Sequence, residues 1–83
     1  MDITQLQYFR TVAHLEHITQ AAEELHISQP NLSNAIKRLE TSLGVALFER
    51  RNGRIFLNDY GKSIWRLSTM PLRFWMPQKT RFT

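Results

Sequence analysis

Apolar residues recur every three or four positions along the first part of the chain, which is the spacing of one helix face. The first stripe predicts a helix over about 3–15 and consists of Leu6, Phe9, Val12 and Ala13. Either Asp2 or Thr4 is expected to cap its start by accepting a hydrogen bond from a free backbone N–H. The segment 14–17, in which three of the four residues are polar, predicts a connector.

A second, shorter helix is predicted to begin at Thr19, whose hydroxyl is a good helix cap. Ala21 and Ala22 belong to its buried side, and two adjacent methyl groups let a neighbouring helix approach closely. Leu25 completes that side, and residues 26–27 are expected to form a tight turn.

The clearest stripe follows Ser28, which is the natural cap of a third helix over 29–43. Pro30 fits the first turn of this helix, and Gly44 suits its C-terminal end. The apolar face of the helix consists of Leu32, Ile36, Leu39 and Leu43. The opposite face is polar and consists of Gln29, Asn31, Ser33, Asn34, Lys37 and Arg38.

Two short strand-like runs, 47–50 and 54–57, flank Asn52 and Gly53, a pair that strongly favours a β-hairpin. Asn58 is then expected to cap a fourth helix. This order of elements predicts a mainly α fold of the winged helix-turn-helix class. It would have a three-helix core, a two-stranded β-hairpin wing and the start of a linker helix.

The chain is expected to divide into three segments. Residues 1–58 would form the winged helix-turn-helix domain, and residues 59–69 a truncated linker or dimerisation helix. Residues 70–83 have two prolines, three bulky aromatic side chains and no acid, which predicts an atypical, disordered tail. Pro71 should stop the fourth helix.

The composition indicates one small globular domain, because the chain has 83 residues of which 42% are hydrophobic. The absence of cysteine excludes a disulfide framework, a thiolate zinc site and a cysteine nucleophile. The N-terminus lacks a secretory signal pattern, and no apolar run approaches the ~20 residues of a membrane span. We therefore expect a cytoplasmic protein with no membrane partner.

The net charge of +4 is unevenly distributed. Residues 1–36 hold one base and four acids, a net charge of −3, whereas residues 37–83 hold ten bases and three acids, a net charge of +7. This distribution suggests an anionic partner, although a solvated face can produce the same charge pattern.

The element order suggests that this partner is DNA, because an α-helix fits the major groove, where all four base pairs differ. Short, neutral, polar side chains at the start of the third helix suit base edges, and Asn or Gln favours adenine. Lys37 and Arg38 suit phosphates, and the hairpin tip over 50–54, with Arg50, Arg51 and Arg54, suits a minor groove. Each residue alone is more often part of a solvated face, so the prediction rests on the joint pattern.

Three stretches resemble the amino-terminal DNA-binding domain of LysR-type transcriptional regulators. They are LQYF at 6–9, ITQAAEELHISQPNLS at 18–33 and IKRLE followed by LGVALFER within 36–50. The resemblance covers about residues 1–68 and its motifs are highly specific.

The resemblance implies a dimeric or higher bacterial regulator that binds an imperfect DNA palindrome. By position, the groove-facing residues would be Gln29, Pro30, Ser33 and Asn34, with Arg54 in the wing. The full set of predicted DNA-binding residues is Thr19, Gln20, Ser28, Gln29, Pro30, Asn31, Ser33, Asn34, Lys37, Arg38, Arg51 and Arg54. Homodimerisation is expected through Ile64, Trp65 and Leu67 of the fourth helix.

The chain departs from the family pattern at four points, of which the conservative one is Asn58 in place of the usual threonine cap. Asn34 stands where arginine is frequent, which favours adenine over guanine as the contacted base. Gln20 replaces a frequent base, which removes one phosphate contact. Family members continue into a long linker helix and an effector-binding domain. We therefore expect a truncated or frame-shifted form, or one with a foreign tail, with weakened dimerisation and no small-molecule effector.

Other function classes are less well supported. His14, His17 and His26 have no carboxylate or thiolate placed to complete a metal site. The sequence offers no nucleophile–base pair and no glycine-rich phosphate loop, so neither catalytic residues nor a cofactor are expected. The main alternative is a winged-helix protein–protein interaction or dimerisation module, which the polar leading face of the third helix disfavours.

Overall fold

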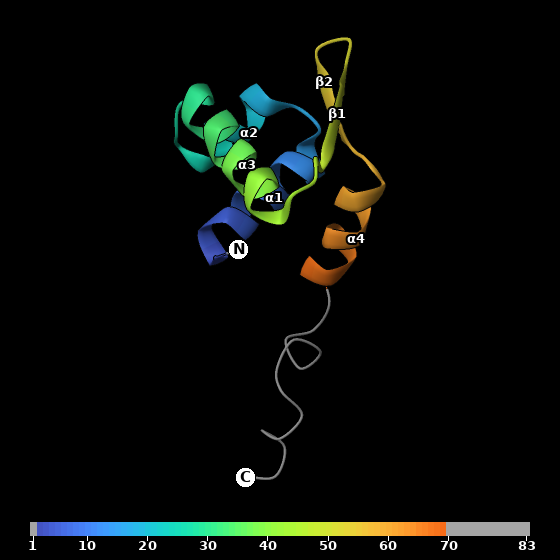
Figure 1. Ribbon diagram of the computed structural model, residues 1–83. Coiled ribbons are helices and arrows are strands. Elements are labelled where there is room, and N and C mark those ends of the chain that lie inside the picture. Colours follow the sequence, from blue (N-terminus) through green and yellow to red (C-terminus); the bar gives the residue numbers. More distant parts are fainter. Residues whose placement is uncertain (1, 70–83) are drawn as a thin grey trace, which may run out of the picture.

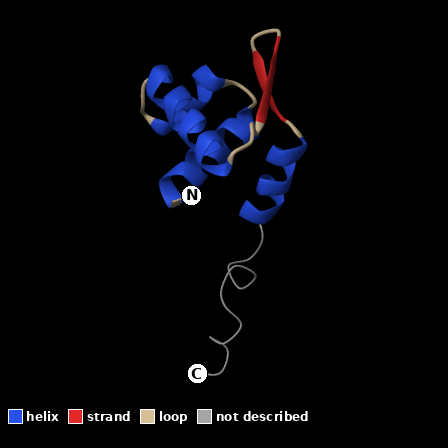
Figure 2. Ribbon diagram, in the orientation of Figure 1, coloured by secondary structure: helices blue, strands red, loops and turns tan. Residues whose placement is uncertain are grey.

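The computed structural model describes residues 2–69, and within them four helices accompany one antiparallel hairpin (Figure 2). The elements are α1 (Ile3–Leu15), α2 (Ile18–Leu25), α3 (Gln29–Leu43), β1 (Phe48–Arg51), β2 (Arg54–Leu57) and α4 (Asp59–Ser68). The mainly α, winged helix-turn-helix prediction is confirmed. The predicted tail, 70–83, lies outside the described residues.

Three of the four helices begin at the cap that the sequence suggested. Asp2 caps α1, where its Oδ1 accepts a hydrogen bond from the backbone N–H of Gln5 at 2.8 Å. Ser28 caps α3 and Asn58 caps α4 in the same way. A short side-chain oxygen at this place satisfies a backbone donor that the helix itself leaves free.

The predicted cap of α2 was wrong. The helix begins at Ile18 and not at Thr19, because His17 takes the cap position. Its Nδ1 accepts a hydrogen bond from the backbone N–H of Gln20 at 3.4 Å. The hydroxyl of Thr19 is therefore not a cap, and it points to a different partner that is described below.

The core lies where α1, α2 and α3 meet, and Figure 1 shows these helices gathered on one side of the hairpin. One cluster of its buried residues comes from all three helices and from β2 and consists of Val12, Ile18, Ala21, Ala22, Leu32, Ile36 and Ile55. A second cluster consists of Phe9, Leu39 and Leu47. Leu43 was expected to extend the apolar face of α3, but its side chain is 38% exposed. The last turn of α3 runs past the core.

The hairpin forms the predicted wing, with Arg51 paired to Arg54 across a two-residue turn. Asn52 and Gly53 both have positive φ, 52° and 74°, as a type I′ turn requires. The first strand is one residue later than the predicted 47–50. Leu47 instead precedes the strand and is fully buried.

The base of the wing is joined to α3 and α4 by hydrogen bonds to the backbone around Leu47. Glu40 Oε2 accepts from the N–H of Leu47 at 2.7 Å, and the N–H of Asn58 donates to the Leu47 carbonyl at 2.9 Å. Gly61 lets α4 approach this backbone, because a Cβ there would collide with the Leu47 carbonyl oxygen. These contacts fix the wing relative to α3.

Candidate nucleic-acid interface

The leading face of α3 is open to solvent. Gln29, Pro30, Asn31, Asn34, Lys37 and Arg38 are all exposed, and Ser33 is half-buried. The opposite face of the same helix carries Leu32, Ile36 and Leu39, which are buried in the core. Amphipathic packing therefore presents the predicted base-reading side chains outward as one surface.

A tight turn between α2 and α3 sets the direction of α3. His26 ends α2 in a left-handed conformation with φ 59°, and the N–H of Ile27 donates to the Ala22 carbonyl at 3.0 Å. Ser28 then begins α3 through a 3.2 Å hydrogen bond from the N–H of Asn31 to its Oγ. The half-buried Ile27 packs against the core beneath the turn.

The two helices of this motif are also linked side chain to side chain at its exposed edge. The hydroxyl of Thr19 donates to Oε1 of Gln29 at 3.2 Å. Both residues, and the neighbouring Gln20, are exposed. Thr19 and Gln20 near the start of α2 thus lie beside the first residue of α3.

The wing has one outward face on which basic side chains gather around an aromatic ring. The guanidinium carbons of Arg51 and Arg54 lie 5.4 Å and 5.6 Å from the ring centroid of Phe56. Both arginines are exposed. Cation–π contact of this kind holds the positive charge near the tip of the wing while leaving it accessible.

Arg54, the wing arginine that the sequence suggested, also contacts the end of α1. Its Nε donates to the Glu16 carbonyl at 3.1 Å, and one terminal nitrogen lies 3.5 Å from Glu16 Oε1. The Arg54 side chain remains 49% exposed, so this contact lies at the surface and is open to solvent. Sequence reasoning missed Glu16 because it lies 38 residues away from Arg54 in the chain.

A shallow hollow of about 420 Å³ lies along the outer side of α3. Asn34, Lys37, Arg38, Thr41 and Ser42 line it. Two cations and three neutral hydrogen-bonding side chains make this surface suited to phosphate oxygens. It continues the leading face toward the C-terminal half of α3.

The three predicted dimerisation residues are not equally exposed, so they are not equally available to contact a second copy of the chain. Ile64 and Trp65 are half-buried and pack against the cluster of Phe9, Leu39 and Leu47. Leu67 is 50% exposed. Tyr60, which sequence reasoning missed, is 61% exposed, and its i, i+4, i+7 spacing with Ile64 and Leu67 could have revealed it.

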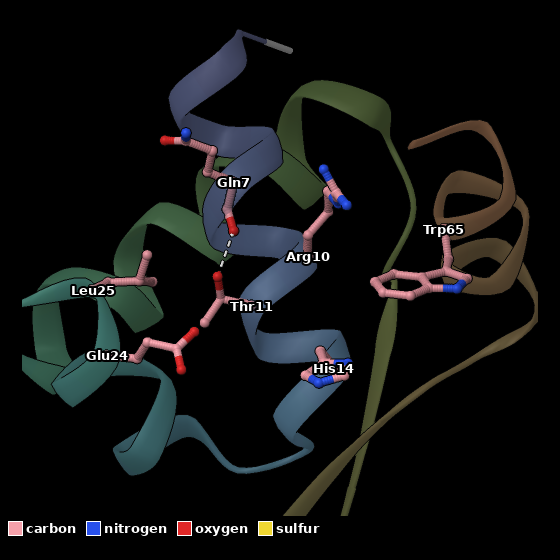
Figure 3. A pocket seen from close by; sticks show the side chains of 7 residues that line it. All are labelled: Gln7, Arg10, Thr11, His14, Glu24, Leu25 and Trp65. Carbon is pink, nitrogen blue, oxygen red and sulfur yellow. Dashed lines mark hydrogen bonds between the residues drawn. The ribbon is translucent and has the colours of Figure 1, made fainter. Parts of the chain in front are cut away.

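A second hollow, about 390 Å³, lies on another side of the molecule, between α1, α2 and α4. Figure 3 shows its lining side chains: Gln7, Arg10, Thr11, His14, Glu24, Leu25 and Trp65. None belongs to the predicted DNA-binding set. The two other histidines, His17 and His26, are helix-end residues.

Among residues 2–69, no group of three or more metal-ligating side chains is placed to hold an ion. Within the same residues, no helix has the length and apolarity that crossing a membrane would need.

Comparison with known families matches residues 3–62 to the bacterial regulatory helix-turn-helix proteins of the lysR family. The chain is 52% identical over 61 residues to the uncharacterized HTH-type transcriptional regulator YybE of Bacillus subtilis (strain 168). That match covers 74% of this chain and 21% of YybE. The chain thus spans about a fifth of the length of this relative.

Two solved structures of DNA complexes are similar to this fold. The CbnR_DBD–DNA complex has a TM-score of 0.81 at 35% identity, covering 90% of this chain and 86% of that one. The BenM_DBD/catB site 1 DNA complex has a TM-score of 0.78 at 34% identity, covering 82% and 76%.

Proposed function

The chain belongs to the LysR family of bacterial regulatory helix-turn-helix proteins, and from this premise we propose that it binds double-stranded DNA sequence-specifically. The observation that carries the proposal is the exposed, neutral, polar leading face of α3 beside a basic wing. In this arrangement α3 enters the major groove and the wing lies along an adjacent minor groove. Residues 1–58 are the DNA-binding domain, and 59–69 belong to the linker helix.

Base reading is assigned to the first two turns of α3. Gln29, Ser33 and Asn34 present short hydrogen-bonding groups that match base edges, and Asn34 suits adenine. Pro30 and Asn31 complete this leading face. The supporting fact is that these side chains are exposed, except for the half-buried Ser33, which leaves them free to enter a groove.

Backbone contacts are assigned to the residues around that face. Lys37 and Arg38 carry positive charge in the hollow along α3, where phosphates would lie. Gln20 and Ser28 stand near the starts of α2 and α3, where helix N-termini favour anions. Arg51 and Arg54 supply the wing with the cations that a narrow minor groove attracts.

A homodimer formed through α4 is the second part of the proposal. The exposed side chains of Tyr60 and Leu67 lie on one side of this helix with Ile64 between them. A second copy of α4 would cover this stripe. Two copies related by a two-fold axis would place two α3 helices on a palindromic site.

Selection of bound sites from random duplex DNA, performed with residues 1–83, tests the proposal. We expect one recurring sequence, bound at least tenfold more tightly than random DNA of the same length. Gln29→Ala and Ser33→Ala should each reduce this preference by about 1–3 kcal/mol, because a base contact is lost. Binding that shows no sequence preference would refute the base-reading role of α3.

Lys37→Ala is the matched control for those variants. It removes a charged side chain from the same helix, and we expect it to weaken binding to the selected site and binding to random DNA about equally. A loss of preference in Lys37→Ala as large as that in Gln29→Ala would contradict the division between base and phosphate contacts.

A further inference from the structure

The hydrogen bond between Thr19 and Gln29 constrains the residue that opens the leading face of α3. Thr19 Oγ1 lies 3.2 Å from Gln29 Oε1, and a carbonyl oxygen can only accept, so the hydroxyl is the donor. Both side chains are exposed, so this pair lies at the surface that would meet DNA. An exposed glutamine alone would sample several orientations of its amide group.

The two ends of a carboxamide have opposite hydrogen-bonding character. With Oε1 directed toward Thr19, the Nε2 donor of Gln29 points away from the hydroxyl. In the major groove, purines offer N7 as an acceptor, whereas cytosine offers the N4 donor. With its oxygen directed toward Thr19, the amide presents its donor to the base, which matches a purine and mismatches a cytosine.

We propose that Thr19 is a specificity-determining positioning residue, which orients the Gln29 carboxamide so that it reads a purine and rejects a cytosine. This inference rests on the proposed function and deepens it. Thr19 acts on the base through Gln29 and makes no base contact of its own. Without the hydroxyl, the amide turns over at little cost and its oxygen can accept from cytosine.

A direct contact between Thr19 and a phosphate is the rival role. The two roles differ in what they affect. A phosphate contact adds affinity for every sequence and contributes to the salt dependence of binding. A positioning contact changes the preference among bases at one place in the site and leaves the salt dependence unaltered.

Four variants of the full chain separate these roles: Thr19→Val, Thr19→Ser, Gln29→Ala and the double variant Thr19→Val/Gln29→Ala. Valine has nearly the shape of threonine but no hydroxyl, and serine restores the hydroxyl. Thr11→Val is the matched control, because the Thr11 hydroxyl donates to the Gln7 carbonyl within α1 and lines the hollow of Figure 3. Thermal unfolding of each variant confirms that it is folded.

The base that Gln29 reads is first located as the position in the selected DNA site at which Gln29→Ala abolishes the preference. Affinity is then measured for the selected site and for copies that carry each of the other three bases at that position. We expect Thr19→Val to reduce the purine-over-cytosine preference there about three- to tenfold, the value of one ordinary hydrogen bond. Thr19→Ser should restore the preference, and Thr11→Val should leave it unchanged. In the double variant, Thr19→Val should cause no further loss of preference.

Three outcomes would overturn the inference. The first is that Thr19→Val keeps the base preference. The second is that Thr19→Val weakens binding to all sequences equally and makes the salt slope smaller. The third is that the losses of preference in the two single variants add in the double variant. Failure of the proposed function looks different, because the unmodified chain would then select no site or Gln29→Ala would abolish no preference. That result would remove the base reading that Thr19 is proposed to direct.

Discussion

The guanidinium of Arg54, at the start of β2, is bound to Glu16, the residue that ends α1. Arg54 Nε donates to the Glu16 carbonyl at 3.1 Å, and its terminal nitrogen faces the Glu16 carboxylate at 3.5 Å. The N–H of Ile55 donates to the same carbonyl at 3.3 Å. Glu16 has a left-handed backbone with φ 54°, which turns its carbonyl toward the wing. The end of α1 therefore holds the base of the wing.

This contact places an acid next to a cation that the proposed function assigns to DNA. The Glu16 carboxylate competes with phosphate for Arg54, so Glu16→Gln should raise affinity for DNA. An exposed ion pair contributes little, and we expect an increase of about two- to fivefold at low salt that shrinks as salt is added. Titrations at two salt concentrations measure it.

Glu24→Gln is the control, since it makes the same change of charge at a residue that lines the hollow of Figure 3. We expect it to alter affinity less than Glu16→Gln does. Equal gains from the two variants would show that net charge alone is responsible and that the contact with Arg54 has no special effect.

The wing illustrates what the sequence predicted and what it left open. Asn52 and Gly53 predicted the turn correctly, because a type I′ turn needs positive φ at adjacent positions and few residue pairs permit it. The state of Arg54 depends on Glu16, 38 residues earlier. No local pattern encodes a contact over that distance, so the sequence placed the arginine but not its partner.

The helix ends likewise include caps that the local sequence predicted and one cap that it did not. Ser28 and Asn58 were predicted as caps because a short side-chain oxygen before an apolar run is a local signal. His17 was missed as the cap of α2, since a ring nitrogen in the capping role is uncommon and Thr19 is a stronger nominal cap. The structure instead turns Thr19 toward Gln29, a contact made when two helices pack.

Binding should depend strongly on salt, because cations on α3 and the wing would displace counterions from the phosphates. The logarithm of the binding constant should fall linearly with that of salt concentration, with a slope of about −0.9 for each phosphate contact. Lys37→Ala and Arg51→Ala should each make the slope less negative by about one unit. Affinity independent of salt would exclude an electrostatic interface.

The stability of the domain should depend on Glu40, whose carboxylate accepts the 2.7 Å hydrogen bond from the N–H of the buried Leu47. Glu40→Ala leaves this donor without its partner, which should lower the free energy of unfolding by about 1–3 kcal/mol. Glu40→Gln keeps a neutral acceptor and should cost less. Chemical denaturation measures the free energy for both variants.

Glu23→Ala is the control for Glu40→Ala, because Glu23 is also a helical glutamate but is exposed on α2. Its free energy of unfolding should stay within about 0.5 kcal/mol of that of the unmodified chain. A Glu40→Ala variant as stable as this control would mean that the hydrogen bond between α3 and the wing contributes nothing to folding.

Self-association through α4 should be weak in this chain, because few apolar side chains of the helix are available for it. Leu67 is 50% and Tyr60 61% exposed, while Trp65 packs against the chain's own core. A stable interface buries about 800 Å² on each partner, which two exposed side chains and part of Ile64 do not supply. Sedimentation at micromolar concentration should therefore find mostly monomer, with dimers increasing at higher concentration.

Leu67→Gln should weaken that association by about tenfold, since it replaces the exposed apolar side chain at the end of the stripe with a polar one. Lys62→Gln is the matched control, because Lys62 is exposed on α4 outside the stripe formed by Tyr60, Ile64 and Leu67. A dimer that persists unchanged in Leu67→Gln would place the interface elsewhere on the molecule. A tight dimer at micromolar concentration would contradict the expected weak association.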